Sequence, residues 1–124
     1  KNNQEINDIQ SDKMRELISF SNGSPGQYIT NLKYWLDIPS SLRQKLGSKL
    51  STQIEVLKLA KEIIEELNIE QQIWLINFQQ TLIWEKETNY TLIKILEDLK
   101  KQLLSYVQPR LAWEVALLEM HFRD

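Results

Sequence analysis

His121 is the only histidine of the chain, and it is the residue that most readily suggests a metal or proton-transfer site. Glu114, Glu119 and Asp124 lie close to it in the sequence and could be imagined as further ligands or as a catalytic set. A helical metal site, however, draws two or more close ligands from facing helices, as in Glu-x-x-His pairs. A lone histidine near the end of the sequence lacks that arrangement. We therefore expect His121 to face solvent on the last helical turn and to bind no metal.

Hydroxyl side chains gather where helices are expected to begin. These are Ser21, Ser24, Ser40, Ser41, Ser51 and Thr52. Helix capping explains them without a nucleophile, and the sequence contains no Gly-x-Ser-x-Gly elbow. It also lacks Gly-x-x-x-x-Gly-Lys-Ser/Thr, the loop that cradles nucleotide phosphates. The run of Glu62, Glu65, Glu66 and Glu70 is interpreted as a solvated helix face. We predict a non-catalytic chain without a cofactor.

The composition is that of one soluble globular domain, with 124 residues of which 42% are hydrophobic and 26% charged. Fifteen basic and 17 acidic residues are interleaved in sign and give a net charge of −2. Nucleic-acid binding requires a basic patch or stripe, so direct contact with DNA is not expected. Cysteine is absent, which fits a reducing cytoplasm. No apolar run approaches the ~20 residues that span a bilayer, and no membrane association is expected.

Two further features concern context. The sequence begins at Lys1 without an initiator Met, so we interpret it as processed or, by preference, as a fragment of a longer protein.

The four tryptophans of the chain are Trp35, Trp74, Trp84 and Trp113. Aromatic rings interleaved with basic residues can stack on nucleobases, but basic residues do not cluster around these four. Packing in the core or at an interface is therefore the preferred interpretation.

Hydrophobic periodicity predicts an all-α fold, a helical bundle of about six to seven helices. No stretch alternates with the period of two that is typical of a strand. The expected helices cover about residues 5–21, 25–37, 39–46, 52–67, 69–86, 90–106 and 109 onward. The breaks between them fall near Gly23, Pro39, Gly47, Asn68, Asn89 and Gln108.

Two of these breaks carry clear local signals. Gly23 can adopt the left-handed conformation that ends a helix, and Ser24 is expected to cap the next helix with Pro25 at its first position. Asn68-Ile69-Glu70-Gln71 matches a capping box, with Asn as the cap and Gln at the third helical position. We therefore divide at Asn68 a stretch that could otherwise be one long helix.

The last helix is apolar on more than one side. Pro109 suits its first position. One stripe runs through Leu111, Val115, Leu118 and Phe122 at i, i+4, i+7 and i+11, and a second contains Trp113, Leu117 and Met120. Arg110 and Glu114 form an i, i+4 pair on one face. So wide an apolar surface indicates a helix inside an assembly of helices, with Leu111, Trp113, Val115 and Leu118 packing it.

Two segments carry a resemblance to a known family. The segment Pro109-Arg110-Leu111-Ala112-Trp113-Glu114 resembles the closing helix of bacterial clamp-loader subunits, whose usual form is Asn-Pro-Arg-Leu-Ala-Leu-Glu. The segment Gly23-Ser24-Pro25-Gly26 resembles a stretch in the helical lid of the delta prime subunit of DNA polymerase III. The two segments occur in the order of the family. Gln108 replaces the usual capping Asn, and Trp113 replaces a usual leucine.

The resemblance implies a division of the chain into two parts. Residues 1–37 would be the end of the lid of the ATPase module, and residues 38–124 would be a C-terminal helical collar domain. Catalytic subunits carry an arginine in the lid motif Gly-Ser-x-Arg, where it reaches the nucleotide phosphates. The matching position here is Gly26, which implies the delta prime type, which does not hydrolyse ATP.

The function implied is a non-catalytic oligomerisation domain of the DNA polymerase III holoenzyme. It would hold the subunits together while the sliding clamp is loaded during DNA replication in the cytoplasm. Its partners would be the gamma/tau and delta types of subunit in a hetero-pentamer. The alternative is a free-standing helical adaptor, unrelated to replication, that presents an apolar groove to a partner helix.

Overall fold

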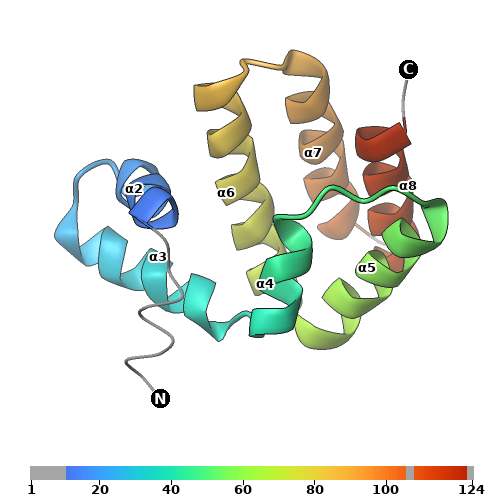
Figure 1. Cartoon of the computed structure of the whole chain (residues 1–124), viewed down its shortest axis with the longest axis horizontal. Coiled ribbons are helices and arrows are strands. Elements are labelled where there is room, and N and C mark those ends of the chain that lie inside the picture. Colours follow the sequence, from blue (N-terminus) through green and yellow to red (C-terminus); the bar gives the residue numbers. More distant parts are fainter. Residues whose placement is uncertain (1–10, 106–107, 123–124) are drawn as a thin grey trace. The chain divides into compact units, whose positions relative to one another are not determined.

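A computed structural model describes residues 11–105 and 108–122, and these residues form seven α-helices and no strand (Figure 1). The helices are α2 (Ser11–Phe20), α3 (Pro25–Asp37), α4 (Ser40–Leu46), α5 (Gln53–Glu66), α6 (Ile69–Lys86), α7 (Tyr90–Leu103) and α8 (Pro109–Phe122). The prediction of an all-α fold is confirmed, and the helices end near each expected break. Residues 5–10 of the first expected helix, and residue 106 of the sixth, lie outside the described residues.

The chain divides into two compact units, residues 1–38 and 39–124. The division falls one residue from the boundary expected between the two parts. In the first unit α2 packs against α3. Asn22 and Gly23 join these helices with positive φ angles of 52° and 75°, so the chain reverses through the left-handed region that glycine tolerates best.

Ser21 stabilises the first unit from inside. Its buried hydroxyl donates to the Leu17 carbonyl over 2.6 Å and accepts a hydrogen bond from the Asn31 side-chain amide over 3.0 Å. The expectation that Ser21 caps a helix start is therefore wrong, because its hydroxyl links the end of α2 to the middle of α3. Ser24, by contrast, caps α3 as expected, and its hydroxyl accepts from the Gln27 N–H.

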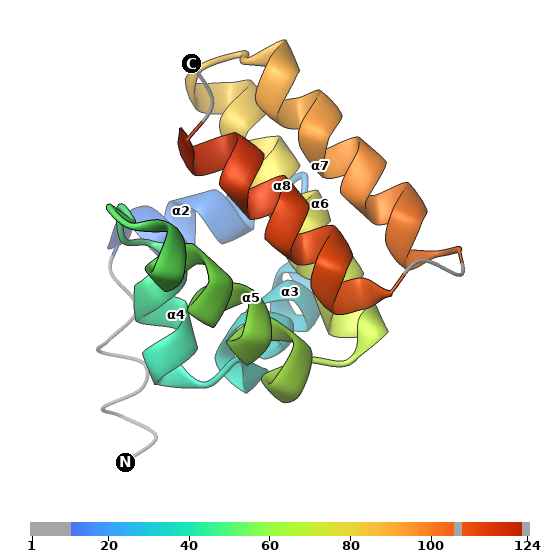
Figure 2. The same cartoon turned by 90° about the vertical axis from the view of Figure 1, so that its right-hand side faces the viewer.

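The second unit is built around α8. This helix packs against both α5 and α7, while α6 packs against α7 and α4 against α5, and Figure 2 shows α8 crossing the unit with α7 beside it. The buried apolar side chains of these helices form the core of the unit. They include Val56, Leu59, Ala60 and Ile63 of α5, Leu75 and Ile76 of α6, Leu96, Leu99 and Leu103 of α7, and Ala112, Trp113, Ala116 and Leu117 of α8.

Two capping boxes set where α5 and α6 begin. Before α5, the Thr52 hydroxyl accepts from the Glu55 N–H, and the Glu55 carboxylate accepts from the backbone N–H groups of Ser51 and Thr52. These hydrogen bonds to the charged form hold the pKa of Glu55 below its usual value. Before α6, Asn68 and Gln71 make the reciprocal pair predicted from the sequence, each bond being 2.8 Å long.

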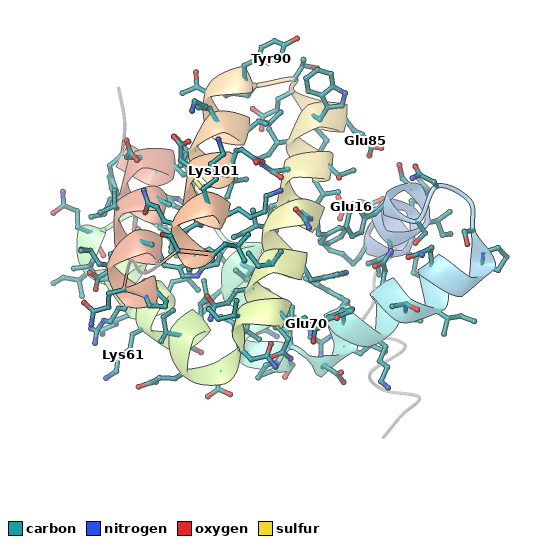
Figure 3. All side chains as sticks on the ribbon, turned by 180° about the vertical axis from the view of Figure 1, so that it is seen from behind. Glu16, Lys61, Glu70, Glu85, Tyr90 and Lys101 are labelled. Atoms are coloured by element: carbon teal, nitrogen blue, oxygen red, sulfur yellow. The ribbon has the colours of Figure 1, made fainter. Side chains whose placement is uncertain are left out.

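The run of glutamates that the sequence analysis interprets as a solvated helix face lies largely on the surface of the second unit. Glu65, Glu66 and Glu70 are exposed, and Figure 3 shows Lys61 and Glu70 pointing away from the helices. Glu62 is half-buried because its carboxylate pairs with the Lys45 ammonium of α4. Within the described ranges, no helix has the length and apolar character that a bilayer crossing requires.

Replacing Asn68 tests the division between α5 and α6. In Asn68→Ala the Gln71 N–H loses its acceptor, and we expect the free energy of unfolding to fall by about 1 kcal/mol. Asn68→Asp keeps a side-chain acceptor at the same place and should unfold within a few tenths of a kcal/mol of the native chain. Urea unfolding followed by circular dichroism measures both. Equal stability of the two variants would contradict the cap.

Candidate protein–protein interface

The inward face of α8 is held by close packing. Ala112, Trp113, Ala116 and Leu117 are buried, and the small alanines allow neighbouring helices to approach closely. Pro109 is the first residue of the helix, as predicted, and the Gln108 carbonyl accepts the Ala112 N–H over 3.1 Å. The start of α8 therefore follows from local chemistry.

A buried hydrogen-bonded chain ties α8 to α6 and to the end of α5. The Trp113 indole N–H donates to the Gln72 side-chain oxygen over 2.8 Å, and the Gln72 amide donates to the Leu67 carbonyl over 2.9 Å. Trp113 is 3% exposed and Gln72 2% exposed. Both polar ends of the Gln72 amide are thus paired within the core, which burial demands. The position of Trp113 within the packing of α8 is that expected from the sequence.

The opposite side of α8 is apolar and exposed. Leu111 is 52% exposed, Val115 46% and Phe122 37%, while Leu118 on the same stripe is half-buried. With 3.6 residues per turn, these residues lie about 140–200° around the helix from Trp113. Leu111 and Val115, which were expected among the residues that pack α8, are therefore not part of the core of the second unit. We call Leu111, Val115, Leu118 and Phe122 the outer stripe of α8.

Arg110 and Glu114 lie along one flank of the outer stripe. Their side chains pair over 3.2 Å, with 51% of the Arg110 and 22% of the Glu114 side chain exposed. An exposed i, i+4 pair of this kind contributes only a few tenths of a kcal/mol to stability. The pair therefore supplies a polar edge to the apolar stripe more than it stabilises the helix.

His121 is half-buried, so the expectation that it faces solvent is wrong. It lines an apolar recess together with Trp113, Leu117 and Met120 of the same helix. Burial disfavours the charged imidazolium and lowers the pKa of His121 below its usual value. Among the described residues, His, Cys, Asp and Glu nowhere gather in a group of three or more that could hold a metal ion.

The Gly23–Gly26 segment forms the turn between α2 and α3 and the start of α3 in the first unit. Gly23 adopts its positive φ there, Ser24 caps α3, Pro25 is the first residue of α3, and Gly26 is exposed in the first turn. A Cβ at Gly26 would meet no atom within 4 Å. The space would admit a side chain at this position, so glycine is not required there by packing.

Two features of the second unit were not found from the sequence. The first is Gln72, which is buried among apolar residues of α6. Its burial is hard to predict because α6 is apolar on most sides, so the sequence pattern does not indicate which side faces the core.

The second feature is a row of polar contacts between α6 and α7. The Lys100 ammonium contacts Asn77 and Glu97 over 2.9 and 3.2 Å, and the Gln80 amide and Lys100 together lower the pKa of Glu97.

Trp84 lies outside the core, so of the two expected kinds of packing only that at an interface stays a prediction for it. It is 50% exposed and meets the ring of Tyr90 edge-on, with centroids 5.5 Å apart, where α6 ends and α7 begins. The other three tryptophans are buried, as their assignment to packing predicted.

Comparison with known proteins gives one finding. The family described as the cyanobacterial DNA polymerase III delta prime, C-terminal domain, matches residues 2–120, so the match spans both units. Neither the search of curated proteins nor that of solved structures found a match.

Replacing Trp113 measures how much its buried hydrogen bond to Gln72 contributes to the stability of the chain. Trp113→Phe keeps an aromatic ring but leaves the Gln72 oxygen without a donor, and we expect the free energy of unfolding to fall by about 1–3 kcal/mol. Trp84→Phe makes the same replacement at an exposed position and should change stability by less than about 0.5 kcal/mol. Urea titration of both variants decides the point. A Trp113→Phe chain as stable as Trp84→Phe would show that the indole N–H contributes nothing.

Proposed function

The chain belongs to the family of the cyanobacterial DNA polymerase III delta prime C-terminal domain, and from this we propose that its second unit holds clamp-loader subunits together. The resemblance stated from the closing helix and the lid motif is thereby confirmed at the level of the family. The oligomerisation role is our proposal. It assigns residues 39–124 to a collar that joins this subunit to its neighbours.

The outer stripe of α8 is the observation that carries the proposal. A helix of a free-standing domain normally turns a polar face to water. Here four large apolar side chains follow one another along the side of α8 that faces away from the core. Exposed apolar surface of this kind, edged by polar groups such as Arg110 and Glu114, marks protein–protein contact sites.

The same reasoning supports a domain that performs no chemistry of its own. The sequence holds no phosphate-binding loop, and the outer stripe offers apolar contact in place of nucleophiles or bases. Its partners in this proposal are the gamma/tau and delta types of clamp-loader subunit in a cytoplasmic hetero-pentamer. With acidic and basic residues nearly balanced, we assign DNA contact to other parts of the complex.

The first unit is proposed to be the end of the lid of the ATPase module. Its support is the Gly23–Gly26 turn, which lies outside the second unit in its own pair of packed helices. Gly26, at the position matching the phosphate-reaching arginine, supports the delta prime type. The free-standing adaptor unrelated to replication has no support from the family match, which spans residues 2–120.

A double substitution in the outer stripe tests the proposal. We expect Leu111→Ser with Val115→Ser to weaken binding of the chain to gamma/tau and delta subunits by at least about tenfold, since anchor side chains at interfaces contribute about 2 kcal/mol or more. Stability of the chain alone should change little, because both side chains are already half-exposed. Size-exclusion chromatography of the mixed subunits and thermal melting of the chain measure the two effects.

The matched control removes two other exposed apolar side chains. Ile29→Ser with Tyr90→Ser changes residues that are 66% and 68% exposed on α3 and α7, and this variant should assemble as the native chain does. Assembly that survives loss of the outer stripe would rule out α8 as the contact surface.

A further inference from the structure

Two exposed aromatic rings lie where α6 ends and α7 begins, and we call them the aromatic pair. The indole of Trp84 is 50% exposed and the ring of Tyr90 is 68% exposed, and they meet edge-on with centroids 5.5 Å apart. Tryptophan is highly buried on average, and the other three tryptophans of the chain are only 3–8% exposed. Packing within the second unit therefore leaves much of the aromatic pair open to another molecule.

The turn between the helices carries both rings on a defined backbone. Thr88 has a φ of 49°, in the left-handed region that β-branched residues rarely adopt. Its N–H donates to the Ile83 carbonyl over 3.0 Å, and its hydroxyl donates to the Trp84 carbonyl over 3.1 Å. Asn89 then caps α7, its side chain accepting from the Leu92 N–H over 3.2 Å. A contact surface that is held in place before binding loses little conformational freedom when a partner docks.

The charges of this turn are distributed unevenly around Trp84. With 3.6 residues per turn, Glu85 and Glu87 lie about 100° and 60° from Trp84, on opposite sides of it. Lys86 lies about 160° away, on the far side of α6. All three charged residues are exposed, and Figure 3 shows Glu85 and Tyr90 at the same end of the unit. The exposed indole is therefore edged by carboxylates.

An aromatic ring edged by carboxylates is suited to a guanidinium group. Tryptophan is the best aromatic partner for a cation, and arginine is the cation found most often in such contacts. The planar guanidinium stacks on a ring while its N–H groups donate to carboxylates. Lys94, one turn after Tyr90, does not compete for this role because its ammonium is paired with Asp98 over 3.0 Å. The carboxylates would repel the phosphates of a nucleic acid.

We infer that the aromatic pair binds an arginine side chain of a partner protein. The guanidinium stacks on the Trp84 indole and donates to the carboxylates of Glu85 and Glu87. The inference goes beyond the proposed function and does not depend on it, because the aromatic pair lies on α6 and α7 whereas the outer stripe lies on α8. Assembly through α8 does not require the arginine contact.

Two peptides that differ in one side chain test the inference. The probes are acetyl-Gly-Arg-Gly-amide and the same peptide with citrulline, which keeps the shape of arginine but carries no charge. The indole N–H signals of the four tryptophans are followed by ¹H–¹⁵N NMR at millimolar peptide concentrations. We expect the Trp84 signal to shift saturably with the arginine peptide, and the citrulline peptide to bind at least about fivefold more weakly. The buried indoles of Trp35, Trp74 and Trp113 provide internal references.

Matched variants locate the contact. Glu87→Gln removes one carboxylate beside the indole and should weaken binding of the arginine peptide by about two- to fivefold. Glu70→Gln removes an exposed carboxylate near the other end of α6 (Figure 3) and should leave the affinity unchanged. In Trp84→Leu, followed through the Thr88 amide signal, the two peptides should no longer differ. Unchanged signals of the buried indoles show that each variant folds.

The outcomes decide for or against the arginine contact. Preference for the arginine peptide that falls in Glu87→Gln and persists in Glu70→Gln supports the inference. A Trp84 signal that does not saturate, or that responds equally to both peptides, overturns it. A stronger response to an oligothymidylate than to the arginine peptide also overturns it, and would identify a base-stacking surface instead. The titration contains no clamp-loader subunit, so its failure would leave the proposed function of the outer stripe standing.

Discussion

The hydrogen bond from the Trp113 indole to Gln72 is the constraint on which the second unit depends. Gln72 lies in the first turn of α6. Its side-chain oxygen accepts from the Trp113 indole N–H, and its side-chain amide donates to the Leu67 carbonyl at the end of α5. Three helices therefore meet through one buried amide, and each polar atom of that amide has a partner. Losing any member would strand a buried donor or acceptor, which costs more than the bond itself contributes. The arrangement holds α8 in one rotation about its own axis.

That rotation decides which apolar side of α8 is available to partners. The sequence of α8 is hydrophobic almost all round, so burial of apolar area by itself would permit several orientations. With Trp113 directed at Gln72, the alanines at 112 and 116 face inward, and Leu111, Val115 and Phe122 are left exposed. Helix α7 shows the contrast, since Leu96, Leu99 and Leu103 form its one buried face and need no polar anchor to define it.

The boundaries of the helices could be predicted because caps act through neighbouring residues. The predicted capping residues are found at the starts of both helices, Ser24 and Pro25 at α3 and Asn68 and Gln71 at α6. The faces of α8 could not be predicted, because two apolar stripes compete and only contact with α5, α6 and α7 selects one. His121 was misplaced for the same reason, since its burial depends on a recess formed by distant helices. The sequence pattern assigns Ser21 wrongly to a helix start and gives Gln72 no role, because the partners of both side chains lie on other turns or helices.

Hydroxyl-radical footprinting of the free and assembled chain tests the central claim most directly. The method oxidises side chains in proportion to their access to water, and mass spectrometry locates the product on each residue without altering the protein. We expect oxidation of Leu111, Val115 and Phe122 to fall several-fold when gamma/tau and delta subunits are bound, with Trp113 protected in both states. Outer-stripe residues that oxidise equally fast in the assembled complex would contradict the assignment of α8 as the subunit interface.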